Sequence, residues 1–102
     1  MPTFIATYDL KETSPDPHSK FLAQAGNFCW KLWILSSANE WFRLPNTTLE
    51  GTFDTMDTAV TALQATRAAT EQEMGRSVTM EKWIVAQHNS AQFNSDTRQP
   101  NR

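Results

Sequence analysis

The sequence contains few of the residues that mark a specific chemistry. Cys29 is its only cysteine, so the chain can form no internal disulfide and no cysteine-rich zinc site. Its two histidines, His18 and His88, lie far apart and in no metal-ligand spacing, and its three glycines form no phosphate-binding loop. These absences disfavour thiol nucleophiles, zinc centres and P-loop enzymes. We expect Cys29, which precedes Trp30, to be a small buried apolar residue.

Neither sign of charge is in excess, and no apolar stretch is long. Nine Lys and Arg residues against eleven Asp and Glu residues give a net charge of −2, which offers no general attraction to phosphate backbones. No stretch approaches the roughly 20 apolar residues of a membrane helix. The N-terminal MPTFIATYD has no basic flank before a long apolar run, as a signal peptide would. We therefore expect a cytoplasmic protein that contacts no membrane.

Apolar residues are nevertheless sufficient for a packed core. They make up 39% of the chain and include four Trp, six Phe and one Tyr, which a disordered chain would lack. A length of 102 residues is near the common size of a single core. We expect one domain over residues 1–86, followed by a polar tail over residues 87–102.

The N-terminal third is predicted to form a strand and a short helix. Alternation of apolar and polar residues predicts a strand over Thr3–Leu10, with Ile5 and Asp9 on one face. The pair Asp16-Pro17 favours the start of a helix, because it places a capping carboxylate before proline at the first helical position. Gly26 is a suitable terminator for that helix.

Three further segments are predicted to be strands. The apolar run Trp30–Leu35 is followed by the polar SSANE and then by WFRLP, which indicates a break and a continuing or returning strand. Thr47–Phe53 is rich in β-branched residues, and its Gly51 suggests a bulge. Val78–Ala86 is the last predicted strand.

The strongest periodic signal is a helix over Asp54–Met74. Apolar residues recur at helical spacing, Asp54 can cap the first turn, and Gly75 stands where a left-handed residue ends a helix. The polar tail after the last strand contains one aromatic residue, Phe93, and no periodicity. We expect this tail to be mobile. The alternative is a short strand around Phe93 that joins a partner subunit.

The predicted order is β-α-β-β-α-β, the pattern of an α+β, ferredoxin-like fold. Such a fold has an antiparallel sheet with two helices on one face, which leaves the other face open. The four tryptophans all lie on or beside predicted strands, and they exceed what one helix-covered face needs. Some of them are therefore expected on the open face, which points to a dimer or a binding surface. They are Trp30, Trp33, Trp41 and Trp83.

A small domain of this kind whose first strand ends in Tyr8-Asp9 resembles a group of short endoribonucleases. The group includes the small CRISPR adaptation subunit, the VapD-type ribonucleases and the GhoS-type antitoxin ribonuclease. The resemblance covers residues 3–86 in element order, and it rests on Tyr8-Asp9 and on the run RLPNTTLEGTF before the second helix. It implies a homodimer in which the first strands end close together. It also implies that Asp9 holds a divalent metal such as Mg²⁺ between subunits, where the metal activates water or stabilises the scissile phosphate.

Three residues are candidate catalytic groups, each with a simpler interpretation. Asp9 is either a metal ligand or a strand-end acid that binds the following loop. His18 is either a general acid or base or an exposed histidine beside Asp16. Arg43 either binds phosphate or pairs with an acid across the sheet. Candidate nucleic-acid contacts are Lys31, Lys82, Arg43, Trp33 and Trp41, which would form a platform if they share the open face.

Three functions remain open on the sequence. The first is a dimeric, Cas-like or antitoxin-like endoribonuclease or RNA-binding protein that belongs to a toxin-antitoxin or related system. The second is a non-catalytic module of a phage or mobile element, which binds a protein partner through the aromatic sheet face. The third is a structural homodimer. The first helix contains Lys20 as its only basic residue, and the net charge of the chain is −2. Both observations favour the second and third functions, whereas Tyr8-Asp9 favours the first.

Overall fold

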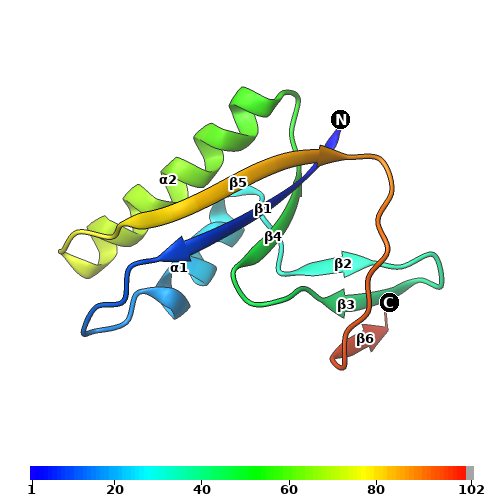
Figure 1. Ribbon diagram of the computed structural model, residues 1–102, viewed down its shortest axis with the longest axis horizontal. Coiled ribbons are helices and arrows are strands. Elements are labelled where there is room, and N and C mark those ends of the chain that lie inside the picture. The colour runs from blue at the N-terminus through cyan, green and yellow to red at the C-terminus, as the bar shows by residue number, and fades with distance from the viewer. Residues whose placement is uncertain (101–102) are drawn as a thin grey trace.

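The computed structural model describes residues 1–100 as an α+β protein with two antiparallel three-stranded sheets and two α-helices (Figure 1). The main sheet has the order β4-β1-β5, and its strands are Thr48–Thr52, Thr3–Leu10 and Met80–His88. The small sheet has the order β2-β3-β6, and its strands are Trp33–Leu35, Glu40–Arg43 and Arg98–Pro100. The helices are α1 (His18–Ala25) and α2 (Met56–Met74), and the short 3₁₀ turn η1 (Gly26–Phe28) follows α1. Within residues 1–100, neither helix has the length and apolar composition needed to cross a membrane.

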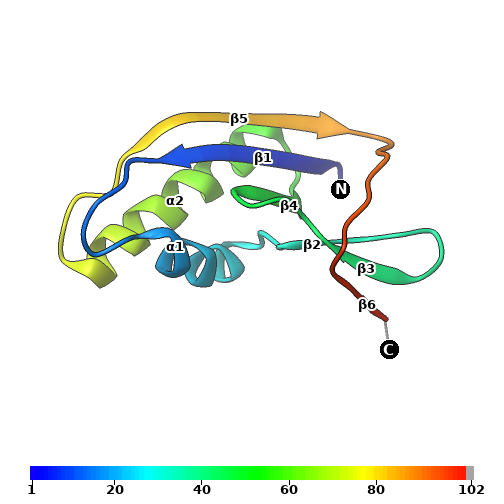
Figure 2. The same cartoon turned by 60° about the horizontal axis from the view of Figure 1, so that its bottom comes forward.

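β1 is the central strand of the main sheet, and its predicted alternation is confirmed. Its even-numbered side chains are buried, whereas Asp9 at its end is exposed. Both helices lie on the side of the main sheet toward which the buried residues point (Figure 2). The other side of the main sheet is its open face. The buried residues of β1 are Phe4, Ala6, Tyr8 and Leu10.

The predicted helix over 54–74 is confirmed, with a different cap. Thr55, in place of Asp54, is the residue with extended backbone before α2, and its hydroxyl accepts a hydrogen bond of 3.1 Å from the Thr58 N–H. A helix cap has extended backbone and accepts a hydrogen bond from an N–H of the first turn, and Thr55 has both properties. Gly75 ends the helix in the left-handed region at φ 66°, as expected.

The predicted four-stranded ferredoxin-like order is not confirmed. Within residues 1–100, the run after Trp30 pairs with the main sheet through an isolated antiparallel bridge between Lys31 and Glu50 of β4, and not through a regular ladder. The chain then leaves the main sheet and forms the hairpin β2-β3. The Ser36 N–H donates a hydrogen bond to the carbonyl oxygen of Glu40 across the turn of this hairpin. The returning-strand interpretation of WFRLP is therefore the one that the structure shows.

The C-terminal segment is attached to the small sheet. β6 pairs with β3 of the same chain, and the ring of Phe93 packs edge-on against Phe42 with 5.4 Å between centroids. Figure 1 shows the segment after β5 running past β2 and β3 to reach β6. The expectation of a mobile tail missed these contacts because residues 98–100 are polar and show no periodicity. Cys29, which we expected to be buried, is exposed and ends η1 with φ 71°.

Three aromatic rings and one glycine pack closely together in the core. Trp30 packs on Phe53 at 4.8 Å between centroids, and Phe53 packs on Phe4 at 6.2 Å. Gly51 of β4 lies against this group. A Cβ on Gly51 would lie 2.7 Å from Phe53 Cε2 and 2.8 Å from the carbonyl oxygen of Cys29. The approach of the Cys29 backbone to β4 therefore requires glycine at this position.

The fit at Gly51 predicts that Gly51→Ala lowers the free energy of unfolding by about 1–3 kcal/mol, the usual cost of overpacking. The matched control is Gly26→Ala, because that glycine has helical backbone angles and no atom within 4 Å of the added Cβ. We expect the control to be neutral or stabilising by about 0.4–1 kcal/mol. Urea denaturation measures both variants, and equal stability of the two alanine variants would contradict the packing described here.

Candidate acid–base cleft

A cleft of about 710 Å³ lies where the open face of the main sheet meets the small sheet. Its walls come from β2, β3 and β4, from the ends of β1 and β5 at Thr3 and His88, and from the segment that follows β5. Trp41, Phe42 and Phe93 supply aromatic surface, and Glu50 and His88 supply titratable groups. Sequence reasoning did not single out this cleft because its walls come from segments far apart in the chain. We call it the acid–base cleft.

The position of Glu50 and His88 follows from strand register. Glu50 of β4 pairs with Ile5 of β1, and His88 of β5 pairs with Thr3 of β1. Ile5 and Thr3 are two residues apart, so both partners project from the open face, diagonally across β1. Glu50 Oε2 lies 3.6 Å from His88 Nε2, and the two side chains are 16% and 21% exposed. They form an acid–imidazole pair that is mostly buried but reachable from the cleft.

Burial affects the acidity of Glu50. Burial raises the pKa of Glu50 above its ordinary value of 4.5, whereas neighbouring His88 and Lys31 act in the opposite direction. Both ring nitrogens of His88 are buried and have no hydrogen-bond partner within residues 1–100. A carboxyl group with a raised pKa and an imidazole whose ring nitrogens have no hydrogen-bond partner are together suited to proton transfer.

Two cations lie against the aromatic walls. Lys31 Nζ is 5.4 Å from the ring centroid of Trp41, and the guanidinium of Arg98 is 5.4 Å from the ring of Phe42. Lys31 is also held beside Glu50, because their backbones exchange hydrogen bonds of 2.7 and 3.0 Å. Neither cation lines the cleft itself, but each lies over a ring that does, so positive charge is present at its borders.

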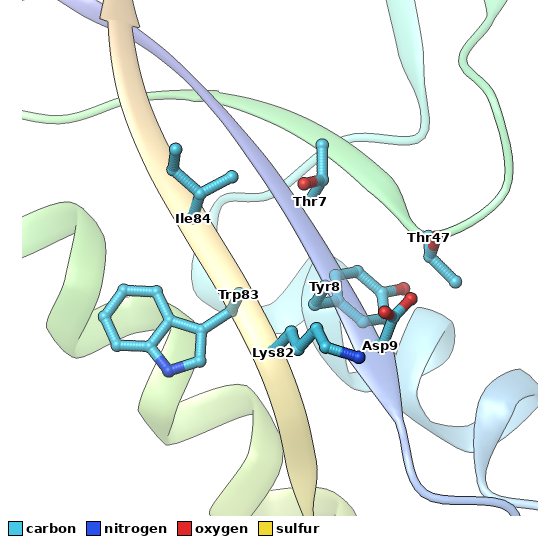
Figure 3. A pocket seen from close by; sticks show the side chains of 7 residues that line it. All are labelled: Thr7, Tyr8, Asp9, Thr47, Lys82, Trp83 and Ile84. Atoms are coloured by element: carbon cyan, nitrogen blue, oxygen red, sulfur yellow. The ribbon is translucent and has the colours of Figure 1, made fainter.

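Asp9 and Lys82, both predicted from the sequence, lie elsewhere, on the open face of the main sheet. They are opposite each other in the β1-β5 ladder and line a shallow pocket of about 410 Å³ (Figure 3). Within residues 1–100 no three His, Cys, Asp or Glu side chains are grouped so that they could hold a metal ion. A metal at Asp9 would therefore need further ligands from a second chain or from a substrate.

His18 is engaged locally at the start of α1. Its Nδ1 lies 2.5 Å from Asp16 Oδ1, and its backbone N–H donates to the same carboxylate at 2.9 Å. Both bonds lower the pKa of Asp16, and the bond from the backbone N–H has the larger effect. The N-cap of α1 is Pro17, which makes no side-chain cap bond, so the prediction of Asp16 as the cap and Pro17 as the first helical residue is wrong by one position. His18 lines neither the acid–base cleft nor the pocket at Asp9.

Arg43 supports the backbone of the small sheet. Its Nη1 donates to the carbonyl oxygens of Leu32 at 3.2 Å and Leu44 at 3.1 Å, in place of an acid across the sheet. Burial raises the pKa of Tyr8 to about 12, and the positive charge of Arg43 acts in the opposite direction. These contacts give Arg43 a structural role.

The predicted nucleic-acid platform is divided between two sheets. Trp33 is opposite Arg43 in the β2-β3 ladder, and Trp41 lies two residues before Arg43, so the three share one face of the small sheet. Lys31 joins them through Trp41, whereas Lys82 lies on β5 of the main sheet. Of the five predicted contacts, Trp41 lines the acid–base cleft and Lys31 lies beside it.

Comparison of the chain with models of known protein families, with curated proteins and with solved structures finds no match. The geometry of the described residues is therefore the basis for any functional assignment.

The raised pKa of Glu50 makes a signed prediction about stability. In the pH range between the pKa values of the unfolded and the folded state, the folded protein binds more protons, so stability falls as pH rises. Glu50 therefore stabilises the fold fully below its unfolded pKa, and this contribution is lost as pH rises through the raised folded pKa. We expect the free energy of unfolding of the wild type, relative to Glu50→Gln, to decrease between pH 4 and pH 7 in urea denaturation.

Glu71→Gln is the matched control, because the sign is opposite. The Val78 N–H donates to the Glu71 carboxylate at 3.0 Å and, with Arg67, lowers the pKa of Glu71. The wild type should therefore gain stability relative to Glu71→Gln as pH rises from below that pKa. A wild-type protein that also gains stability relative to Glu50→Gln would show that the Glu50 carboxyl is not destabilised by burial.

Proposed function

We propose that the chain is a small cytoplasmic endoribonuclease that binds single-stranded RNA in the acid–base cleft and cleaves it by general acid–base catalysis. The observation that supports this proposal most directly is the mostly buried Glu50–His88 pair, 3.6 Å apart, in a cleft with aromatic walls and nearby cations. Paired titratable groups in a cleft are a common mark of a catalytic centre. RNA remains the substrate class that the resemblance at Tyr8-Asp9 implies.

Each group of the cleft has a role in the proposed reaction. The Glu50 carboxylate takes the proton of a ribose 2′-hydroxyl, and the 2′-oxygen then forms a bond to the adjacent phosphorus. The bond from phosphorus to the 5′-oxygen of the next nucleotide breaks, and protonated His88 gives its proton to that oxygen. The products are a 2′,3′-cyclic phosphate and a 5′-hydroxyl, and the water-borne return of one proton from Glu50 to His88 restores the enzyme.

The surroundings of the pair supply binding and charge stabilisation. Trp41 and Phe93 offer faces on which unstacked bases can pack, which is how proteins usually hold single-stranded RNA. Lys31 lies beside Glu50 and can stabilise the negative charge that builds up on the phosphate oxygens. Arg98, over Phe42, is a second contact for the RNA backbone. These local cations compensate for a net charge that does not attract RNA.

This proposal keeps the predicted activity and moves its centre from Asp9 to Glu50 and His88. Asp9 is an exposed acid opposite Lys82, and within residues 1–100 no neighbouring acid completes a metal site with it. The ferredoxin-like interpretation also remains a proposal. In it, the Lys31–Glu50 bridge marks the edge of β4 where the fourth strand of such a sheet would pair.

RNA cleavage by purified variants tests the proposal. We expect the wild type to cut a mixed-sequence single-stranded RNA in EDTA and to leave 2′,3′-cyclic phosphate ends. Glu50→Gln and His88→Gln should each lower the cleavage rate at least a hundredfold, within the range that general acid–base groups contribute. Glu81→Gln, an exposed acid on β5, is the matched control and should cut normally, as should Asp9→Ala.

Binding is measured separately by fluorescence anisotropy, so that loss of chemistry and loss of RNA are distinguished. Lys31→Ala and Trp41→Leu should weaken RNA binding, whereas Glu50→Gln should retain it. Cleavage that requires Mg²⁺ and disappears in Asp9→Ala would return the site to Asp9. A folded wild type that neither binds nor cuts RNA would refute the function.

A further inference from the structure

β5 is a long sheet edge that the described part of the chain leaves open. Its nine residues pair with β1 on one side, and within residues 1–100 no strand pairs with its other side. Ile84 is 61% exposed and Trp83 is 42% exposed, both unusually high for large apolar side chains in a strand. Natural edge strands are commonly protected by proline, by covering segments or by inward charges, because open edges pair with other chains. Met80–His88 contains no proline.

The register shows which backbone groups of β5 point outward. The Tyr8 N–H donates to Thr47 on the β4 side of β1, so the even-numbered residues of β1 direct their backbone groups toward β4. The odd-numbered residues, which include Thr7 and Asp9, direct theirs toward β5. Their partners Ile84 and Lys82 bond back to β1. Over residues 82–88, where the ladder is regular, the outward-pointing N–H and C=O groups of β5 therefore belong to Trp83, Val85 and Gln87. Glu81 lies at the register irregularity opposite Asp9 and Leu10.

We propose that a second copy of this chain pairs with β5 in antiparallel orientation, about a two-fold axis that passes beside Ile84. The two main sheets would then join into one continuous six-stranded sheet with the order β4-β1-β5-β5-β1-β4. Ile84 is the middle residue of Met80–His88, so this axis pairs the regular part of the strand symmetrically and brings Glu81 near Gln87 of the other copy. It also brings the most exposed apolar side chain of β5 against its own copy.

Charge supports a second copy as the occupant and selects the register. With the axis beside Ile84, Lys82 faces Ala86 of the partner strand and Glu81 faces Gln87, so no like charges are opposed. A register centred on Lys82 would instead bring two ammonium groups together, which is destabilising. The outward groups of Trp83 meet those of Val85, so each donor in the central part of the edge faces an acceptor.

This dimer bears directly on the role of Asp9. Its carboxylate lies on β1, one strand away from the interface and opposite Lys82. Across three strand spacings and four residues of offset, the two Asp9 residues would be roughly 20 Å apart. They could not share one cation. The pocket of Figure 3, which includes Lys82, Trp83 and Ile84, would border the interface instead.

The oligomeric state in solution tests this inference, independently of any RNA cleavage. Sedimentation equilibrium should show a dimer for the wild type. Ile84→Lys and Ile84→Glu should each raise the dimer dissociation constant at least tenfold, because like charges would meet at the axis. An equimolar mixture of the two variants should recover the dimer, since lysine then faces glutamate. Such recovery cannot arise from misfolded chains.

Two further variants separate edge pairing from other contacts. Gln87→Pro removes an outward N–H without removing a bond to β1, and it should also weaken the dimer at least tenfold. Thr52→Lys places the same charge at an exposed position of β4 on the opposite edge of the main sheet and should leave the dimer intact. A monomeric wild type, a larger wild-type oligomer, or a dimer that persists in Ile84→Lys would overturn the proposal.

Discussion

The strand β1 is the element on which the rest of the structure depends. Its two neighbours β4 and β5 pair with it and not with each other, so its alternation decides the face of every side chain in the main sheet. The apolar set of β1 is buried against α1 and α2, and this burial is the main favourable term for a core of this size. A shift of one residue would exchange the two faces and expose Phe4 and Tyr8, so the register is strongly specified.

The acid–base cleft is a consequence of that register and of one departure from regular sheet geometry. Because Ile5 and Thr3 share the open face of β1, their partners Glu50 and His88 approach each other across it. The chain after Lys31 leaves the main sheet at Glu50, and the small sheet then closes over the pair with Trp41 and Phe42. Partial burial of a carboxyl group costs stability. A partly buried carboxyl group beside an imidazole whose nitrogens have no hydrogen-bond partner is more typical of a reactive site than of a purely structural contact.

The two proposed surfaces use different parts of the main sheet. The cleft involves the end of β5 at His88 and the middle of β4, whereas the proposed dimer uses the free edge of β5 around Ile84. Trp83, on that edge, is 42% exposed, but it is opposite Tyr8 and so lies on the helix-covered side of the main sheet, not on the open face where the sequence led us to expect exposed tryptophans. Trp30 is in the core. The aromatic residues of the small sheet are partly buried, and they serve as cleft walls more than as a flat platform.

The sequence by itself determined the local elements. Period-two alternation located β1, helical periodicity located α2, and Gly75 marked its end, because these signals depend only on neighbouring residues. It also placed Asp9 correctly on the less apolar face of β1. The meeting of Glu50 with His88, the departure of β2 from the main sheet and the return of β6 to β3 were decided only by the tertiary structure. Each of these joins segments distant along the chain, and side-chain patterns within one segment hold no information about which distant segment will lie beside it.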